Sequence, residues 1–286
     1  MGIGRRRCAA RAVAAVCAGL LACSAQPARA EVSAQDGFAP GGGYQVHVEF
    51  DPYLWLPASA GTVKLGNGAT ANINAGIPSI SQLTNVLTGA FMGTIVTRYG
   101  PWSGLIDIQY VSAAKSQSLR PDLLGLPRSL HFSTSLTRVA PGIGYQVYNG
   151  ALGTVPTTLD AQAGFVWFGS STTLDLDRYG PAGRERVSSL SGSTDQTQPW
   201  VGLHGAIYPA PRWRLAADIV VQGFGVGGGT WGWETQETAT WAATKWLNLI
   251  AGFRAISSGI NTGYDRAIRS LRLTEYGPEL GIGITF

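Results

Sequence analysis

The chain has 286 residues, of which only 13% are charged, whereas glycine (39 residues) and tryptophan (9) are abundant. The first thirty residues hold five of the 21 lysines and arginines, none of the 17 acidic residues and all three cysteines, so the remainder carries 16 basic and 17 acidic groups. This nearly neutral, cysteine-free remainder excludes a charge-driven nucleic-acid binder, a disulfide scaffold, a zinc–thiolate site and thiol catalysis.

Residues 1–30 have the layout of a secretory signal peptide. The arginines at positions 5–7 form a positively charged start, an apolar stretch follows, and Ala28-Arg29-Ala30 is a small-x-small cleavage site. We therefore expect Glu31 to be the first residue of the mature chain. An uncleaved anchor and lipoprotein processing at Cys23 are the two alternatives.

After a glycine-rich, flexible segment at 31–43, the sequence predicts one domain of ten strands over residues 44–286. Each strand alternates apolar and polar residues with period two, and turn residues separate the strands. No stretch of this region approaches 18 consecutive apolar residues, so no transmembrane helix is predicted. The predicted strands are Tyr44–Leu56, Gly89–Tyr99, Gly104–Val111, Leu130–Tyr148, Val155–Phe168, Thr197–Tyr208, Trp213–Phe224, Trp231–Thr244, Leu247–Ser257 and Leu271–Phe286.

The connections between these strands alternate in length. Short turns such as Gly100-Pro101 alternate with long polar segments, which is typical of the periplasmic turns and external loops of outer-membrane barrels. The first long segment, 57–88, could hold a hairpin around Gly66-Asn67-Gly68 and a short helix over Pro78–Leu87, or fold back as a plug. If the hairpin joins the wall, the strand count becomes twelve. The long segments are 57–88, 112–129, 170–196 and 258–270.

Aromatic residues gather at both ends of the predicted strands. The two interfaces of a bilayer select two such girdles, whereas a soluble sandwich would spread its rings through a core. The sequence therefore predicts an all-β fold, a transmembrane antiparallel β-barrel of ten strands, with twelve as the alternative. The periplasmic girdle comprises Tyr44, Tyr99, Trp102, Tyr148, Tyr208, Trp213, Trp246 and Phe286, and the external girdle comprises Tyr53, Trp55, Tyr110, Trp167, Trp231, Trp233 and Tyr276.

The last strand ends in alternating apolar residues, Leu280, Ile282, Ile284 and the terminal Phe286. This pattern resembles the C-terminal signature of Gram-negative outer-membrane β-barrel proteins, and residues 51–56 resemble the start of a family of uncharacterised small outer-membrane barrels. The resemblance implies a place in the outer membrane, in contact with its lipid and lipopolysaccharide. It also implies that these four residues are an assembly signal read by the barrel-assembly machinery. It brings no catalytic residue and no cofactor.

The polar faces of the strands predict a lumen that carries charges of both signs, and hence no strong ion selectivity. Because unpaired charges are costly in a narrow lumen, we expect carboxylates to meet inward arginines, including Arg272. His47, Glu49 and Asp51 share one face and could alternatively hold a cation, although we predict no metal site. The expected lumen-lining residues are His47, Glu49, Asp51, Arg98, Asp107, Gln109, Asp160, Arg214, Asp218 and Arg254.

His131 and Ser133 resemble the His-x-Ser pair of outer-membrane phospholipases and lipid A deacylases. Period two places them opposite Leu130, Phe132 and Leu136, and hence toward the lumen rather than the lipid. In addition, Ile143 occupies the position twelve residues on, where those enzymes carry the residue that orients the histidine. We therefore expect no enzyme, with an esterase or deacylase that uses this pair as the alternative.

A barrel of ten strands has a lumen that side chains largely fill. The sequence therefore predicts an integral outer-membrane barrel that acts as a narrow, porin-like channel or binding barrel for small solutes. The alternative is a structural or surface-interaction barrel that acts through its external loops. We expect no cofactor and no nucleic-acid partner.

Overall fold

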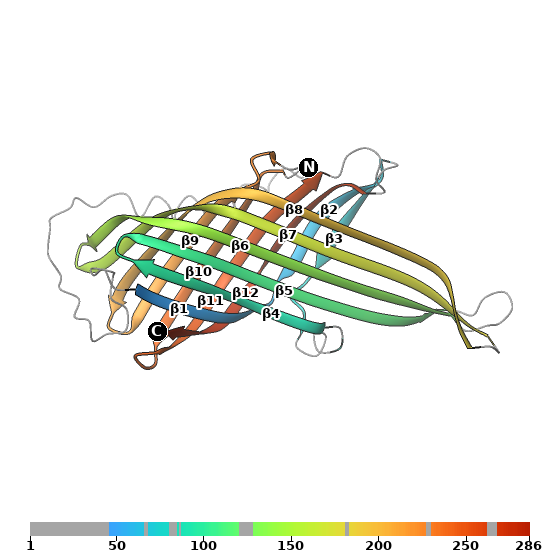
Figure 1. Ribbon diagram of the computed structural model, residues 1–286, viewed down its shortest axis with the longest axis horizontal. Helices are drawn as coiled ribbons and strands as arrows, with labels where there is room; N and C mark the ends of the chain where they lie inside the picture. The colour runs from blue at the N-terminus through green and yellow to red at the C-terminus, as the bar shows by residue number, and fades with distance from the viewer. Residues whose placement is uncertain are drawn as a thin grey trace, which may run out of the picture.

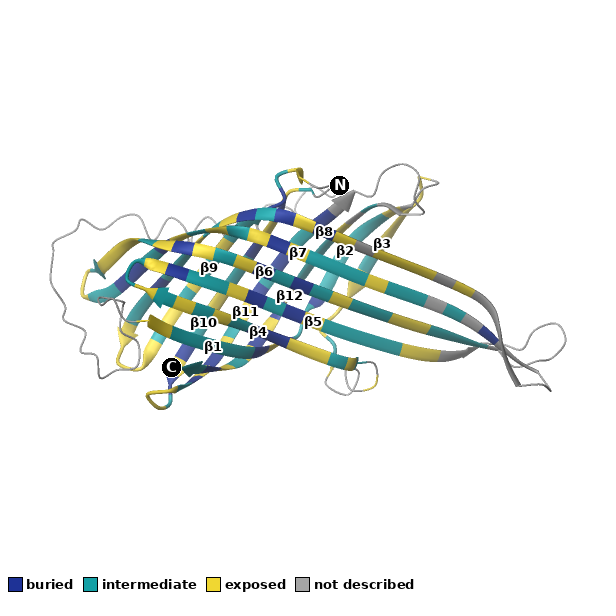
Figure 2. Ribbon diagram, viewed as in Figure 1, coloured by how far each residue is buried: buried dark blue, intermediate teal, exposed yellow. Residues whose placement is uncertain are grey.

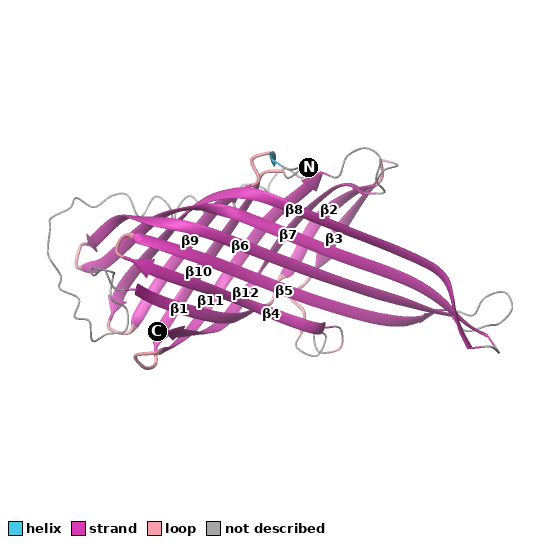
Figure 3. Ribbon diagram, viewed as in Figure 1, coloured by secondary structure: helices cyan, strands magenta, loops and turns pink. Residues whose placement is uncertain are grey.

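A computed structural model describes residues 46–65, 68–79, 85, 87–119, 128–180, 183–226, 230–261 and 268–286. The predicted signal peptide, its two alternatives and the glycine-rich segment lie outside these residues. The described residues are almost entirely strand (Figure 3), and no helix among them could span a membrane. The strands are β1 (Val46–Trp55), β2 (Ala58–Leu65), β3 (Thr70–Ala75), β4 (Leu87–Tyr99), β5 (Trp102–Leu119), β6 (Arg128–Leu152), β7 (Val155–Gly180), β8 (Gly183–Ala210), β9 (Trp213–Gln222), β10 (Gly232–Ala242), β11 (Leu247–Asn261) and β12 (Ile268–Thr285).

Ten of these strands close into a barrel. They follow one another in the order β1, β4 to β12, every neighbouring pair is antiparallel, and β1 pairs with β12 to close the ring (Figure 1). The closing seam runs from the pair Glu49 and Thr285 to the pair Trp55 and Glu279. Closure gives each strand of the ring a neighbour on both sides, which satisfies the backbone hydrogen bonds that an open edge would leave unpaired. The prediction of a ten-stranded antiparallel barrel is confirmed.

The hairpin β2–β3 extends the sheet without joining the ring. Beyond the seam, β12 continues and pairs with β2, from Tyr276 opposite Ala58 to Ile268 opposite Leu65. Strands β1 and β2 are therefore two successive partners of β12, separated by Leu56-Pro57. The predicted hairpin exists, but the described part of 57–88 lies in the sheet, so the plug interpretation is wrong for those residues. Most of the predicted helix at 78–87 lies outside the described residues.

Strands β5 to β8 are far longer than the sequence predicted. The segments 112–129 and 170–196, which we expected to be loops, are largely strand, and β7 and β8 reach 26 and 28 residues. The pairing of β4 with β5 ends at Leu87, and that of β9 with β8 ends at Gln222. Beyond these points β5 to β8 pair only with one another, and they project from the barrel as a four-stranded sheet (Figure 1). We call this part the projecting sheet.

Alternate residues of each strand face opposite sides of the barrel wall. On β6, Arg138 and Ala140 are buried inside the barrel, whereas Ile143 and Tyr145 are exposed on the outside. Buried and exposed bands alternate along the other strands in the same way (Figure 2). An apolar outside around a charged inside is the reverse of a soluble protein, and it is the arrangement of a membrane β-barrel.

The polarity of the two faces inverts on the projecting sheet. The pairing of β5 with β6 runs from Trp102 to Leu119 without a register shift, so the parity set by Arg138 continues along β6. The outward positions above it include Thr137, Ser133 and His131, whereas the inward positions include the apolar Leu136 and Phe132, on either side of Thr134. The outer face therefore changes from apolar to polar near Thr137, which marks the external limit of the surface suited to hydrocarbon.

Glu237 is an exception on the apolar outer face. It lies on β10, midway between the outward residues Trp233 and Trp241, and its cross-strand neighbours are Ala217 and Phe253. Among the outward positions between the two aromatic girdles that the structure describes, Glu237 is the only charged residue. Ionisable side chains at this depth are rare in membrane proteins because hydrocarbon does not hydrate them.

We expect the replacement of Glu237 by leucine to raise the free energy of unfolding by about 2 kcal/mol, because an acidic side chain leaves the lipid face. The reciprocal change on the neighbouring strand, Ile219→Glu, should lower the free energy of unfolding by a similar amount. Urea titrations of the barrel folded in lipid vesicles would measure both. A loss of stability in Glu237→Leu would show that the carboxylate has a stabilising partner.

Candidate functional site

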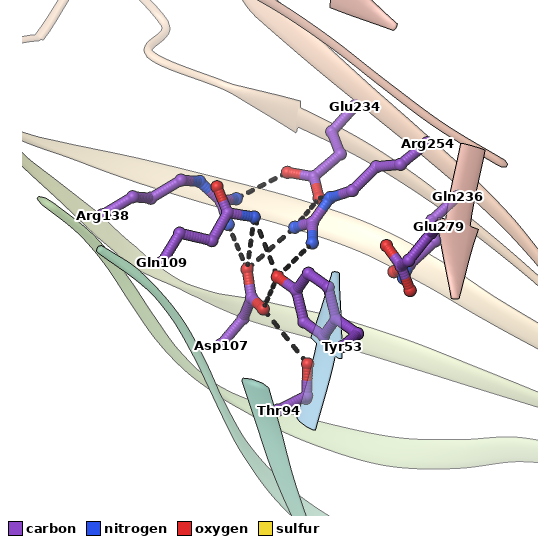
Figure 4. Close-up of polar contacts among 9 residues, drawn as sticks. All are labelled: Tyr53, Thr94, Asp107, Gln109, Arg138, Glu234, Gln236, Arg254 and Glu279. Carbon is purple, nitrogen blue, oxygen red and sulfur yellow. Dashed lines mark hydrogen bonds and ion pairs between the residues drawn. The ribbon is translucent and has the colours of Figure 1, made fainter. Parts of the chain in front are cut away.

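Four charged side chains meet across the lumen at mid-height: Asp107 of β5, Arg138 of β6, Glu234 of β10 and Arg254 of β11 (Figure 4). Arg138 Nη2 lies 2.5 Å from Glu234 Oε2, and Arg254 Nη2 lies 2.8 Å from Asp107 Oδ2. Each arginine also pairs with the other carboxylate. Because β6 and β10 are the fourth and eighth strands of the ring, and β5 and β11 the third and ninth, these two pairs join opposite walls of the barrel. We call the four residues the lumen cluster.

The lumen cluster is buried and richly hydrogen-bonded. Arg254 is 2% exposed and Asp107 is 7% exposed. The Tyr53 hydroxyl donates to Asp107 Oδ1 at 2.6 Å and accepts hydrogen bonds from Arg254 Nη1 at 2.7 Å and from Gln109 Nε2 at 2.9 Å. Two positive and two negative groups make the cluster neutral. Removal of any one of them would leave a buried charge without its full set of partners, which is costly in such an environment.

Aromatic and apolar side chains cover the external side of the lumen cluster. The guanidinium of Arg254 lies 5.7 Å from the centre of the Tyr53 ring and 5.9 Å from that of Trp55, and Arg138 lies 5.9 Å from the centre of the Phe168 ring. Tyr53 and Trp55 were expected in the external girdle, but that prediction is wrong because both side chains face the lumen. They pack in a buried cluster whose other members are Met92, Ile256 and the partly buried Val111. Cation–π contacts of this kind add to the ion pairs. These side chains therefore form an aromatic and apolar layer on the external side of the lumen cluster.

A cavity of about 780 Å³ lies between the lumen cluster and the end of the barrel that carries the short turns, the predicted periplasmic end. Its wall carries further ion pairs. Arg214 Nη1 and Nη2 on β9 donate to the two carboxylate oxygens of Glu49 on β1, at 2.9 and 3.0 Å. This pair also crosses the lumen. Arg98 pairs with Asp160, and His204 Nδ1 lies 2.8 Å from Asp218 Oδ1. The cavity is therefore a polar chamber in which most charges have a partner of opposite sign.

Nine of the ten residues predicted to line the lumen line this cavity, and the tenth, Gln109, lies beside the lumen cluster. Sequence reasoning missed Arg138 and Glu234, which complete the cluster, and also Glu279. On β6, the apolar residues Leu130, Phe132 and Leu136 were assigned to the lipid face. Arg138, which has the same parity, was therefore not expected in the lumen. The expectation that Arg272 faces inward is wrong, because Arg272 is exposed and shares its parity with the outward Tyr276.

His131 and Ser133 lie on the outer face of the projecting sheet, so their predicted orientation toward the lumen is wrong. Three neighbouring strands contribute to the surroundings of His131. Its Nδ1 lies 2.6 Å from Ser116 Oγ on β5, and its Nε2 lies 3.2 Å from Asp177 Oδ2 on β7 and 3.3 Å from Ser129 Oγ. Asp177 is fully buried, whereas Ser116 and Ser133 are exposed. The prediction failed because the apolar residues of this part of β6 face the inside of the projecting sheet.

The residues expected to form an assembly signal lie at the closing seam. Leu280 and Ile282 are exposed on the outer face of β12, and Ile284 shares their parity. The terminal Phe286 is 74% exposed, and its backbone N–H donates to the carbonyl of Val48 at 2.9 Å. The C-terminus is thus held against β1, where the ring closes.

No protein-family model and no curated protein matches the chain, but solved structures do. The outer-membrane protease OmpT from Escherichia coli aligns with a TM-score of 0.47 at 10% identity, over 84% of this chain and 96% of OmpT. The translocator domain of the autotransporter NalP from Neisseria meningitidis gives 0.38 at 12%, over 96% and 94%. Ail, the attachment invasion locus protein of Yersinia pestis, gives 0.31 at 9%, over 85% and 99%. By its own architecture, a closed ring with an apolar exterior, the chain has the fold of an outer-membrane β-barrel.

We expect Arg254→Met to lower the free energy of unfolding by about 3–5 kcal/mol, because Asp107 and Glu234 lose a shared buried partner. Lys115→Met, at an exposed position of the projecting sheet, should change it little. Urea titrations in vesicles measure both. A double-mutant cycle with Asp107→Asn tests the cause, since additive effects of Arg254→Met and Asp107→Asn would show that the two groups do not interact.

Proposed function

We propose that the chain is an integral outer-membrane barrel that binds a small polar solute in its periplasmic cavity and is closed to conduction by the lumen cluster. The observation that carries the proposal is the position of the cluster, which joins opposite walls directly above the cavity. The apolar outer face supports the membrane location. In this proposal that face contacts lipid and lipopolysaccharide, and Phe286 is presented to the barrel-assembly machinery.

The size and the lining of the cavity suit a small solute. A volume of about 780 Å³ falls within the range of small-molecule sites. Its wall combines charged groups with apolar side chains such as Trp200 and Ile250, which offers both orientation and contact area. Passage from the cavity to the external side would require the four ion pairs of the cluster to break together. The intact barrel therefore binds rather than conducts.

Single-channel recording in planar bilayers tests the role of the cluster. The unmodified barrel should give no conductance steps. A quadruple variant with serine at positions 107, 138, 234 and 254 should conduct, because it removes all four charges at once and leaves none unpaired. The double variant Glu49→Gln with Arg214→Gln is the control, since it removes a pair from the cavity wall and keeps the cluster. Steps from the unmodified barrel, or silence from a correctly folded quadruple variant, would contradict the proposal.

A second candidate function rests on Ser116, His131 and Asp177, which form a Ser–His–Asp arrangement on the outer face. In an ester hydrolase, His131 would take the proton of Ser116 as the serine oxygen attacks an acyl carbonyl, and Asp177 would stabilise the charged imidazole. The alcohol would leave with that proton, and water would then release the acid. This function ranks second because none of the three residues adjoins the cavity.

A fluorophosphonate probe separates this function from a polar surface without activity. We expect the barrel, if it is a hydrolase, to be labelled at Ser116, and Ser116→Ala to abolish the labelling. His131→Ala should slow it at least a hundredfold, because the serine loses its base. Ser133→Ala, on the same face, is the matched control and should be labelled normally. An unlabelled but folded unmodified barrel would exclude this function and leave the binding barrel.

A further inference from the structure

The charges that line the cavity do not all have partners. Among the described residues, every arginine of the cavity and of the lumen cluster pairs with a carboxylate, and Asp218 pairs with His204. Two lining carboxylates, Asp51 and Glu279, have no cationic side chain within ion-pair distance. Two basic residues of the lining remain: Lys245 in the exposed turn between β10 and β11, and the exposed His47 near the start of β1. The paired sets are Arg98 with Asp160, Arg214 with Glu49, and Arg138 and Arg254 with Asp107 and Glu234.

The two carboxylates lie on adjacent strands of the closing seam, Asp51 on β1 and Glu279 on β12. Glu279 is only 2% exposed, and its Oε1 accepts a hydrogen bond from Gln236 Nε2 at 2.8 Å, whereas its Oε2 has no hydrogen-bond partner. Asp51 Oδ1 is also buried without a partner. Both residues line the cavity. A buried carboxyl oxygen without a donor is a costly arrangement unless a ligand supplies the donor.

On β12 the wall between these carboxylates carries no side chain. The inward positions that follow Glu279 are Gly281 and Gly283. A Cβ atom at Gly283 would come within 2.6 Å of Asp51 Oδ1, and one at Gly281 would come within 3.1 Å of Tyr53 Cβ. Glycine at these positions therefore lets side chains of β1, including the Asp51 carboxylate, pack directly against β12. The room for a ligand comes from the cavity that both carboxylates line.

The surroundings favour an organic cation over a metal ion. The described residues contain no group of three or more histidine, cysteine or acidic side chains placed to hold a metal. The same cavity presents apolar side chains, among them Leu105, Val220 and Ile250, which suit an aliphatic stem. An ammonium group carries three hydrogen-bond donors and one positive charge, which match an acidic pair that lacks both.

We propose that Asp51 and Glu279 form a binding site for a small aliphatic amine, whose ammonium groups face the two carboxylates while its stem contacts the apolar wall. The site rests on the proposed function, since it names the class of solute that the periplasmic cavity takes. It gives the mixed-charge lumen a preference for cations at this one position. The preference arises from the closing seam and not from the lumen cluster.

Isothermal titration calorimetry of the complete barrel in lipid nanodiscs tests the site with three probes of equal chain length. These are 1,4-diaminobutane, the neutral 1,4-butanediol and the dianion succinate. We expect binding of the diamine only. The double variant Asp51→Asn with Glu279→Gln should bind it at least tenfold more weakly. Asp175→Asn, on the outer face of the projecting sheet, is the matched control and should bind it as the unmodified barrel does.

Two results would overturn the site: equal binding of the three probes, or diamine binding that the double variant leaves unchanged. The thermal unfolding midpoint of the double variant without ligand guards against a folding defect, and it should not fall, because two unneutralised charges are removed. Failure of this proposal is separable from failure of the proposed function. If the quadruple cluster variant conducts but the unmodified barrel binds no diamine, the gate is retained and the amine site is rejected. If the barrel binds the diamine but the quadruple variant gives no conductance, the amine site is retained and the gate is rejected.

Discussion

The structure depends on the neutralisation of charge inside a narrow closed wall. The ring of ten strands satisfies its backbone by closure, but it also directs every second side chain into a narrow lumen. The lumen cluster meets this constraint with two arginines and two carboxylates drawn from opposite walls. Because these pairs cross the barrel rather than follow one strand pair, the same contacts that neutralise the charges also brace the wall and close the lumen. In the proposed function, stability and closure of the lumen therefore depend on the same four residues.

The outer face is governed by a different constraint, which changes along the strands. Where hydrocarbon would surround the barrel, outward residues such as Ile143 and Phe165 are apolar. Beyond Thr137 the same parity carries hydroxyls, His131 and Asp175, while apolar residues turn inward. The same strands thus continue from the hydrocarbon-facing wall into the projecting sheet. The change from apolar to polar outward residues marks the boundary between the two. The polar outer face of the projecting sheet is also what brings Ser116, His131 and Asp177 together.

Against this background, the charges that escape neutralisation stand out. Glu237 lies on the apolar face, and Asp51 and Glu279 lie in the cavity with a carboxyl oxygen that has no hydrogen-bond partner. Buried or lipid-facing ionisable groups are expensive, so they are retained where another molecule or a function compensates. The lumen cluster, whose four charges are all paired, is by the same reasoning a structural element, and we propose that it is also the gate.

The sequence alone determined that the chain forms ten antiparallel strands with short turns at one end, and it identified most residues of the lumen wall, because period-two alternation and turn chemistry are local properties. It could not determine which face of a strand meets lipid. Alternation divides β6 into two faces, but Leu136 and Ile143 are both apolar and face opposite sides, and only the unbroken register with β5 and β7 decides between them. For the same reason Arg138 and Glu234 emerged only from the folded barrel. A pair that joins the fourth and eighth strands of a ring is fixed by the closure of the sheet, and no spacing along the chain encodes it.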